Sequence, residues 1–246
     1  MDLLFFFLLA VVFWVVVQYA GISLFIYMLH RAQPDLDWSA LAQHTSERIQ
    51  YNAFFLVPTQ VVYYGLLLLL LLLLVRRRGL GFSRALVVQP LGGRQLAPVL
   101  LLGMVLALLI QMANWVFPPP VELPFDRLLT DRAAALLILT ASLLVAPLVE
   151  ELVFRGYVYT VLEPLWGVRA AVLASGVLFG AIHFPQLWPG YFQMASLCAV
   201  GIAFSWTRAR LGSTTAAIAA HFAYNATISA LFLASPQFRQ LPAWLG

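Results

Sequence analysis

The sequence contains no lysine, a single cysteine and few acidic residues, and each shortage narrows the classes of protein that it can encode. All 14 basic residues are arginine, against 10 acidic residues, so the net charge is +4. One thiol, Cys198, cannot close a disulfide within the chain, which excludes a disulfide-stabilised secreted scaffold. Charged residues make up 10% of the 246 residues, whereas soluble domains average about 25%. A water-soluble domain and a disordered chain are both excluded.

The sequence is correspondingly rich in apolar residues, which form 63% of the chain, and the mean hydropathy is +0.91. They gather in long segments, and about 20 mostly apolar residues suffice for a helix to cross a bilayer. We therefore predict an all-α integral membrane protein, a polytopic bundle of about seven transmembrane helices, or eight if one long segment is broken. The predicted spans are residues 3–29, 54–75, 97–117, 133–162, 170–183, 191–207 and 214–234. Within the second span, the leucine run 66–74 is predicted to face lipid.

The uneven distribution of arginine among the loops predicts the orientation in the membrane. The loop after the second span carries five arginines and no acid, and the loop after the sixth carries Arg208 and Arg210; both are expected in the cytoplasm. The loops after the first and third spans each sum to one net negative charge and are expected outside. We divide the chain into N-terminal helices with the arginine-rich loop, residues 1–96, and a bundle, residues 97–246, whose core covers about residues 130–234.

Three segments in the C-terminal half place ionisable side chains where hydrocarbon is expected. Each such group costs about 2.5–3.5 kcal/mol on insertion scales and usually marks function. Taken singly, each segment has a structural explanation: an ion pair at a helix end, an interfacial histidine, or a polar contact between helices. Taken together, the three segments favour a shared polar site. Its candidate residues are Glu150, Glu151, Arg155, His183, His221 and Asn225.

The spacing of these residues predicts which of them face one another. Glu151 and Arg155 are four positions apart with the acid first, so they can pair on one helix face. Glu150 then lies about 100° around the same helix. His221 and Asn225 are also four positions apart and are expected to project side by side.

The rise of a helix predicts the depth of each group in the membrane. At 1.5 Å per residue, Glu151 lies about 17 Å, His183 about 21 Å and His221 about 13 Å from the cytoplasmic ends of their helices, if the fourth helix continues to about residue 162. The three side chains can then meet at one level, in a site that opens to the cytoplasm. If the fourth helix ended at the acid pair, the carboxylates and the His183 ring would lie at opposite faces. Gly176 and Gly180 form a G-x-x-x-G pattern that allows close helix packing.

Carboxylates and imidazoles in a partly dry cavity can take a proton from water, so water attack on an amide is the expected reaction. Histidine and asparagine can also donate hydrogen bonds to a developing oxyanion. No serine or cysteine accompanies the set at a suitable spacing, which argues against a nucleophilic triad. Zinc hydrolysis stays open as an alternative, because Glu150, His183 and His221 could supply three ligands with one position free. No H-E-x-x-H motif occurs, however.

The ordered motifs E-E-x-x-x-R, F-x-x-x-H and H-x-x-x-N on successive apolar segments resemble those of the CPBP family, also called the ABI family. This family includes the CAAX prenyl endopeptidases of the second type. The resemblance covers about residues 130–234. All the motif positions are filled here, by Glu150, Glu151, Arg155, Phe179, His183, His221 and Asn225.

The resemblance implies an intramembrane endopeptidase built as a helical bundle. By position, Glu150 with His183 would activate the water, and His221 with Asn225 would stabilise the oxyanion. The other acid and the arginine of the first motif would support the site. The family has been described both as a metalloprotease and as a metal-free glutamate protease. The metal-free form is favoured, so no cofactor is expected, and zinc is the alternative.

The resemblance also implies the partners and the location. The expected substrate is a membrane-associated protein or peptide, lipidated or anchored at its C-terminus, in the lipid bilayer of a bacterial plasma (inner) membrane; no nucleic acid is expected. The main alternative is a non-enzymatic immunity or adaptor protein of the same fold. A proton-coupled carrier is a third hypothesis, but the sequence offers no paired broken helices and no recognisable repeat.

Overall fold

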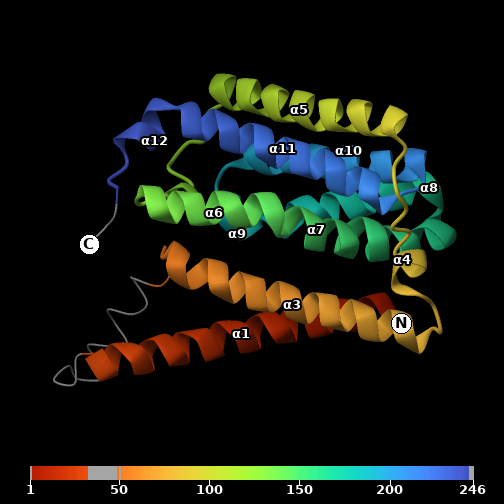
Figure 1. Cartoon of the computed structure of the whole chain (residues 1–246), viewed down its shortest axis with the longest axis horizontal. Helices are drawn as coiled ribbons and strands as arrows, with labels where there is room; N and C mark the ends of the chain where they lie inside the picture. Colours follow the sequence, from red (N-terminus) through yellow and green to blue (C-terminus); the bar gives the residue numbers. More distant parts are fainter. Residues whose placement is uncertain (1, 33–48, 50, 244–246) are drawn as a thin grey trace.

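The protein is a bundle of helices in the computed structural model, which describes residues 2–32, 49 and 51–243 (Figure 1). No β-strand occurs among these residues, as the sequence predicted. Most of the predicted first loop, residues 33–48 and 50, lies outside them, so its charge balance stays a prediction. The elements are α1 (Asp2–Ala32), α3 (Ala53–Arg77), α4 (Phe82–Ala85), α5 (Gly93–Val116), η1 (Asp126–Leu128), α6 (Arg132–Leu144), α7 (Ala146–Glu151), η2 (Leu152–Val158), α8 (Tyr159–Ala181), α9 (Phe184–Leu187), α10 (Tyr191–Leu211), α11 (Thr214–Ala234) and α12 (Pro236–Gln240).

Five helical segments of the described chain are long and apolar enough to cross a membrane, which confirms an all-α integral membrane protein but not the count of seven. The predicted fourth and fifth spans fall within one 50-residue segment. The predicted sixth span corresponds to α10, which is not among the five because its glutamine, hydroxyl and arginine side chains lower its hydropathy. The five segments are Leu3–Ala32, Ala53–Arg77, Gly93–Val116, Arg132–Ala181 and Thr214–Ala234.

The 50-residue segment reverses direction at Gly167, inside α8. This glycine has φ 77° and ψ 165°, a conformation that residues with a Cβ rarely adopt. Beyond it the chain returns along itself: the Ser175 hydroxyl donates to the Phe154 carbonyl (2.9 Å), and the Phe154 and Phe179 rings lie 5.6 Å apart. The two halves of the segment therefore form a helical hairpin, with the turn inside the boundary predicted between residues 162 and 170.

The stretch that carries the two acids departs from regular α-helix on both sides. α6 ends at Leu144, and Pro147 in the first turn of α7 has no N–H to continue the α-helical bonding. α7 then passes directly into η2, a π-helix of seven residues that are all buried. π-Turns are rare and occur mostly at functional sites. This one holds the Arg155 side chain in the interior of the bundle, beside the acids.

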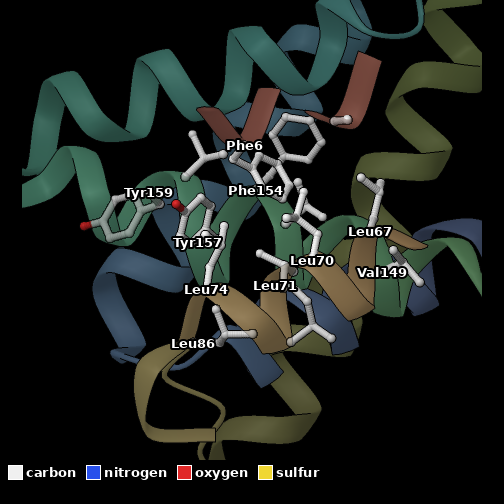
Figure 2. Close-up of a cluster of buried hydrophobic side chains, with 14 of the residues drawn as sticks. Phe6, Leu67, Leu70, Leu71, Leu74, Leu86, Val149, Phe154, Tyr157 and Tyr159 are labelled. Carbon is white, nitrogen blue, oxygen red and sulfur yellow. The ribbon is translucent and has the colours of Figure 1, made fainter. Parts of the chain in front are cut away.

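The largest buried cluster packs α1 and α3 against α7 and η2 (Figure 2). The leucine run 66–74 contributes one face to this cluster, whereas Leu69 and Leu73 on its other face remain exposed. The prediction that the run faces lipid is therefore wrong for one side of α3, because the helical period gathers every third or fourth leucine on one face. The buried leucines of the run are Leu67, Leu70, Leu71 and Leu74.

Glycines allow two pairs of helices to pack at short range. α8 packs closely on α10 and α5 on α11. A Cβ added at Gly176 would overlap the backbone of Ile202, and one added at Gly103 would overlap the Ala220 carbonyl oxygen. The predicted close packing at the G-x-x-x-G pattern is thus confirmed, and it brings the α10 backbone within reach of the acid-bearing stretch.

The two arginine-rich loops lie at the same end of the bundle. At the start of α11, the Ser213 hydroxyl donates to the Gln89 carbonyl (2.7 Å) and the Thr214 hydroxyl to the Leu86 carbonyl (2.6 Å). These contacts join the α10–α11 turn, which follows Arg208 and Arg210, to the loop that follows α3. The arrangement agrees with the expectation that both loops face one side of the membrane.

Candidate active site

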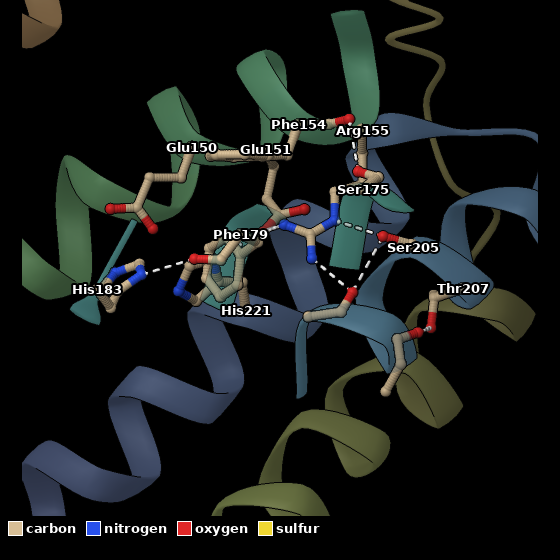
Figure 3. A network of polar contacts seen from close by, with 12 residues as sticks. Glu150, Glu151, Phe154, Arg155, Ser175, Phe179, His183, Ser205, Thr207 and His221 are labelled. Carbon is tan, nitrogen blue, oxygen red and sulfur yellow. Dashed lines mark hydrogen bonds and ion pairs between the residues drawn. The ribbon is translucent and has the colours of Figure 1, made fainter. Parts of the chain in front are cut away.

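Glu151 lies at the centre of a buried polar network formed by η2, α10 and α11 (Figure 3). Its Oε1 accepts a hydrogen bond from Arg155 Nη1 at 2.8 Å and another from His221 Nδ1 at 2.9 Å. The side chains of Glu151 and Arg155 are both 0% exposed. The first and third sequence motifs, about 70 residues apart in the chain, therefore meet at one carboxylate oxygen.

Arg155 is held on every side by α8 and α10. Its Nη2 donates to the Gly201 carbonyl (2.6 Å) and its Nε to the Ser205 hydroxyl (3.2 Å). The guanidinium also lies over the Phe179 ring, at 4.6 Å, and near the Phe204 ring, at 5.6 Å. A cation this enclosed compensates the Glu151 charge in an environment that water does not reach.

The contacts of His221 determine which of its nitrogens carries the proton. Because Nδ1 faces the carboxylate of Glu151, Nδ1 is the donor, and the neutral ring then has its lone pair on Nε2. The ring is 5% exposed and is fixed between Phe204, stacked at 5.0 Å, and the edge of Phe179, at 5.7 Å. Its orientation is thereby fixed by both hydrogen bonding and packing.

Glu150 has a different environment from its neighbour Glu151. Its Oε1 accepts a hydrogen bond from the Tyr64 hydroxyl on α3, and its side chain turns away from the Arg155 network. Among the described residues, Glu150 forms no ion pair with a cationic side chain, and it is 7% exposed. Figure 3 shows its carboxylate and the ring of His183 turned toward the same region, although no hydrogen bond joins them.

His183 lies at the end of the hairpin, where α8 gives way to α9. Its Nδ1 donates to the Phe179 carbonyl (2.8 Å), so the neutral ring also carries its lone pair on Nε2. Glu151 and His183 are each sixteen residues from Gly167, so the hairpin brings them to a similar level. The condition set by the depth argument, that the fourth helix continues past the acids, is met.

Asn225 lies one turn beyond His221, as its spacing predicted, but its amide bonds elsewhere. Its Nδ2 donates to the Ser142 carbonyl (2.7 Å), close to the break between α6 and α7. This contact ties α11 to the backbone just before the acids. One N–H of the amide remains after this bond is made.

The residues that zinc would need do not assemble as a metal site. Among the described residues, no group of three or more histidine, cysteine, aspartate or glutamate side chains could hold a metal ion. The Nδ1 bonds of His221 and His183 leave their Nε2 atoms as possible ligands, but these atoms and the Glu150 carboxylate do not form such a group. The donor set, as this structure arranges it, does not fit zinc.

Several residues of the site carry no recognisable signal in the sequence. They are Tyr64 on α3 and Gly201, Phe204 and Ser205 on α10. A tyrosine in an apolar span is ordinary, and a backbone carbonyl acts irrespective of its side chain. These residues are identified only by the packing of α3 against α7 and of α10 against η2, which the sequence does not reveal.

Residues 132–227 match the model of a protein family described as type II CAAX prenyl endopeptidase Rce1-like. The matched region contains every candidate residue predicted from the sequence and agrees with the resemblance stated above. It is a peptidase family, and the match gives no support to a non-enzymatic immunity or adaptor protein. Neither a curated protein nor a solved structure matches the chain.

Proposed function

From the match of residues 132–227 to a type II CAAX prenyl endopeptidase family, we propose that this membrane protein is an intramembrane endopeptidase. Its substrate would be a membrane-associated protein, and its reaction the hydrolysis of a peptide bond by activated water. The observation that carries the proposal is the Glu151 oxygen shared by Arg155 and His221, beside a second carboxylate, Glu150, that forms no ion pair among the described residues. A buried acid–imidazole pair next to an unneutralised acid suits proton transfer.

In this proposal Glu150 is the general base. One of its oxygens takes a proton from a water molecule while His183 Nε2 accepts a hydrogen bond from the other water proton, which orients the nucleophile. The water oxygen attacks the carbonyl carbon and forms a tetrahedral intermediate. Glu150 then passes its proton to the amide nitrogen as the C–N bond breaks, so the products are a carboxylic acid and an amine. The acid and the histidine return to their starting states.

His221 and Asn225 would stabilise the oxyanion of that intermediate. Nε2 of His221 would donate to the oxyanion with the ring in the imidazolium form, in which Nδ1 keeps its hydrogen bond to Glu151. The N–H of Asn225 that does not bond Ser142 is the second donor, and the Ser142 bond fixes the plane of the amide. Glu151 and Arg155 would then support the site without touching the substrate.

An apolar groove beside the acids supports a substrate that stays in the membrane. It has a volume of about 540 Å³ and lies between α3, α4, α7, η2 and α11. Leu148 and Leu152, which flank the acid pair in the sequence, both line it. Its end at α4 is next to the arginine-rich loop, so access from the cytoplasmic side is part of the proposal. The lining residues are Leu68, Leu69, Leu72, Phe82, Ser83, Val88, Leu148, Leu152 and Ile218.

The test uses the purified full chain in liposomes and an internally quenched, farnesylated peptide that ends in a CAAX sequence. Cleavage is followed by fluorescence, and the bond is identified by mass spectrometry. We expect Glu150→Gln to reduce the rate at least about 100-fold, as loss of a general base does. Glu122→Gln, in a loop where the side chain is 64% exposed, is the matched control and should cleave normally.

A second measurement does not depend on the choice of peptide. The C-termini of membrane proteins are compared in cells that express the wild-type chain or Glu150→Gln. A C-terminus present only with the wild-type chain identifies the substrate and the bond. Cleavage by Glu150→Gln at the wild-type rate, or identical termini together with no cleavage of the peptide, contradicts the proposal.

A further inference from the structure

The residue that holds Glu150 comes from outside the region that matches the family. Tyr64 lies in α3, whereas the match begins at residue 132. Its hydroxyl donates to Glu150 Oε1 across 86 positions of sequence. In the described chain this is the one hydrogen bond that the Glu150 side chain makes. The N-terminal helices therefore reach the proposed base directly.

We infer that Tyr64 is a positioning residue for Glu150, an inference that rests on the proposed function. By holding Oε1, the tyrosine leaves the second oxygen, Oε2, to take the proton from water. Without that bond, the carboxylate on the short α7 helix is free to occupy other rotamers, because no other side chain of the described residues holds it. Glu151 needs no such help, since Arg155 and His221 both hold its Oε1.

The placement of Tyr64 suits this role. The leucines that follow it, such as Leu67 and Leu71, pack α3 against α7 and η2, so the tyrosine is anchored next to the acid. The neighbouring Tyr63 ring lies 6.2 Å away and also packs on the buried cluster. The hydroxyl is neutral, so it orients the carboxylate without cancelling its charge as an arginine would.

A purely structural tie between α3 and α7 is the competing explanation, and it predicts a different result. A tie contributes to folding, and its loss lowers stability or weakens substrate binding. A positioning contact acts on the proton transfer, and its loss lowers kcat in folded protein while KM stays the same. The two explanations are separated by the kcat-against-KM split together with thermal unfolding.

The experiment compares Tyr64→Phe, Tyr63→Phe and Glu150→Gln in liposomes with the quenched farnesylated peptide. Tyr64→Phe removes only the hydroxyl and is expected to lower kcat about tenfold, the scale of one hydrogen bond to a charged group, with KM unchanged and the protein still folded. Tyr63→Phe removes the adjacent hydroxyl from the same helix and is the matched control, expected to behave as wild type. If Tyr64→Phe equals Tyr63→Phe in kcat while Glu150→Gln is inactive, the inference is overturned and the proposed function stands. A change confined to KM or to unfolding overturns it as well.

Infrared spectroscopy supplies a readout that needs no substrate. The carboxylate band of Glu150 is identified as the one that Glu150→Gln removes from the spectrum of the purified protein. Tyr64→Phe is expected to shift that band, and Tyr63→Phe to leave it in place. If no variant changes cleavage because the protein is not a protease, a shifted band still supports the positioning contact, and an unshifted band overturns it.

Discussion

Glu150 and Glu151 are adjacent in sequence, end the same short helix and have different surroundings. Glu151 is 0% exposed and shares one oxygen between a cation and an imidazole. Glu150 is 7% exposed and is held by one neutral hydroxyl, that of Tyr64 on α3. Successive helical positions point about 100° apart, so less than a third of a helical turn separates a carboxylate in an ion pair from one outside it. The difference supports our proposal that Glu151 supports the site and that Glu150 exchanges the proton.

The compensated side is also the side that the fold holds most tightly. Arg155 bonds to the α10 backbone and to Ser205, and Phe179 and Phe204 enclose both the guanidinium and the His221 ring. Buried ion pairs of this kind add little net stability when complete, but they are destabilising when one partner is removed. Stability is therefore expected to depend on the Glu151 side and turnover on the Glu150 side.

The largest expected effect is on folding, from Arg155→Met. This change leaves the Glu151 charge buried without its cation, and loss of one partner of a buried pair costs about 3–5 kcal/mol. The measurement is thermal unfolding of the purified protein in detergent. Ser205→Ala removes one hydrogen bond to the same guanidinium and should cost only about 1 kcal/mol. Equal melting temperatures for Arg155→Met and wild type would show that the pair is not a support.

Glu150→Gln sharpens the comparison from the other side. The amide preserves the shape of the side chain and its contact with Tyr64, so melting should stay within about 0.5 kcal/mol of wild type. Turnover of the farnesylated peptide should fall about 10²–10⁴-fold. Loss of stability with normal turnover would reverse the roles assigned to the two acids.

Gly201→Ala tests whether the support depends on close approach of α10. A Cβ at this position would overlap the Gly176 carbonyl oxygen, and Gly201 supplies the carbonyl that Arg155 binds. Overpacking of this kind costs about 1–3 kcal/mol. Gly65→Ala is the control, because nothing lies within 4 Å of a Cβ there, and it should be neutral or stabilising by up to about 1 kcal/mol. Both are measured by unfolding in detergent, and the same melting temperature for both variants would contradict the packing argument.

The smallest expected effect is that of Asn225→Ala. Its bond to the Ser142 carbonyl should contribute about 1 kcal/mol to stability. Loss of its remaining N–H from the oxyanion should lower kcat about tenfold. Turnover and unfolding are measured on the same preparation. Thr227→Val, two positions further along α11, is the control for the loss of a polar group. Unchanged turnover would restrict Asn225 to the structural bond.

The parts of the site that follow from local geometry were predictable from the sequence. The four-residue spacing predicted the Glu151–Arg155 pair, and the depth argument predicted that His221 could reach it. The parts of the site that depend on which helices pack together were not predictable from the sequence. Tyr64 was not identifiable, because no local pattern states which helix packs against α7. Likewise, the spacing placed Asn225 beside His221 but did not determine the partner of its amide.

The span count shows a similar limit. Hydropathy identifies apolar segments but does not locate their ends. The turn at Gly167, inside the apolar segment Arg132–Ala181, was therefore predicted only as a boundary between two spans, somewhere between residues 162 and 170. The π-helix after Glu151 has no compositional signature at all, since its seven residues read as ordinary buried helix. Its role in turning Arg155 inward comes from backbone geometry alone.

The contributions to the site are spread along the chain in a definite order. Position 64 comes first, the stretch 150–155 follows, and position 221 comes last. During synthesis, we therefore expect α3 to be in the bilayer before the two acids emerge from the ribosome. The Tyr64 hydroxyl is then already in place to bond Glu150. The imidazole that completes the network arrives only when α11 leaves the ribosome. If the proposed function is right, the nascent chain until then has its acids and its arginine but lacks the proposed oxyanion donors, so we expect it not to cleave its neighbours in the membrane.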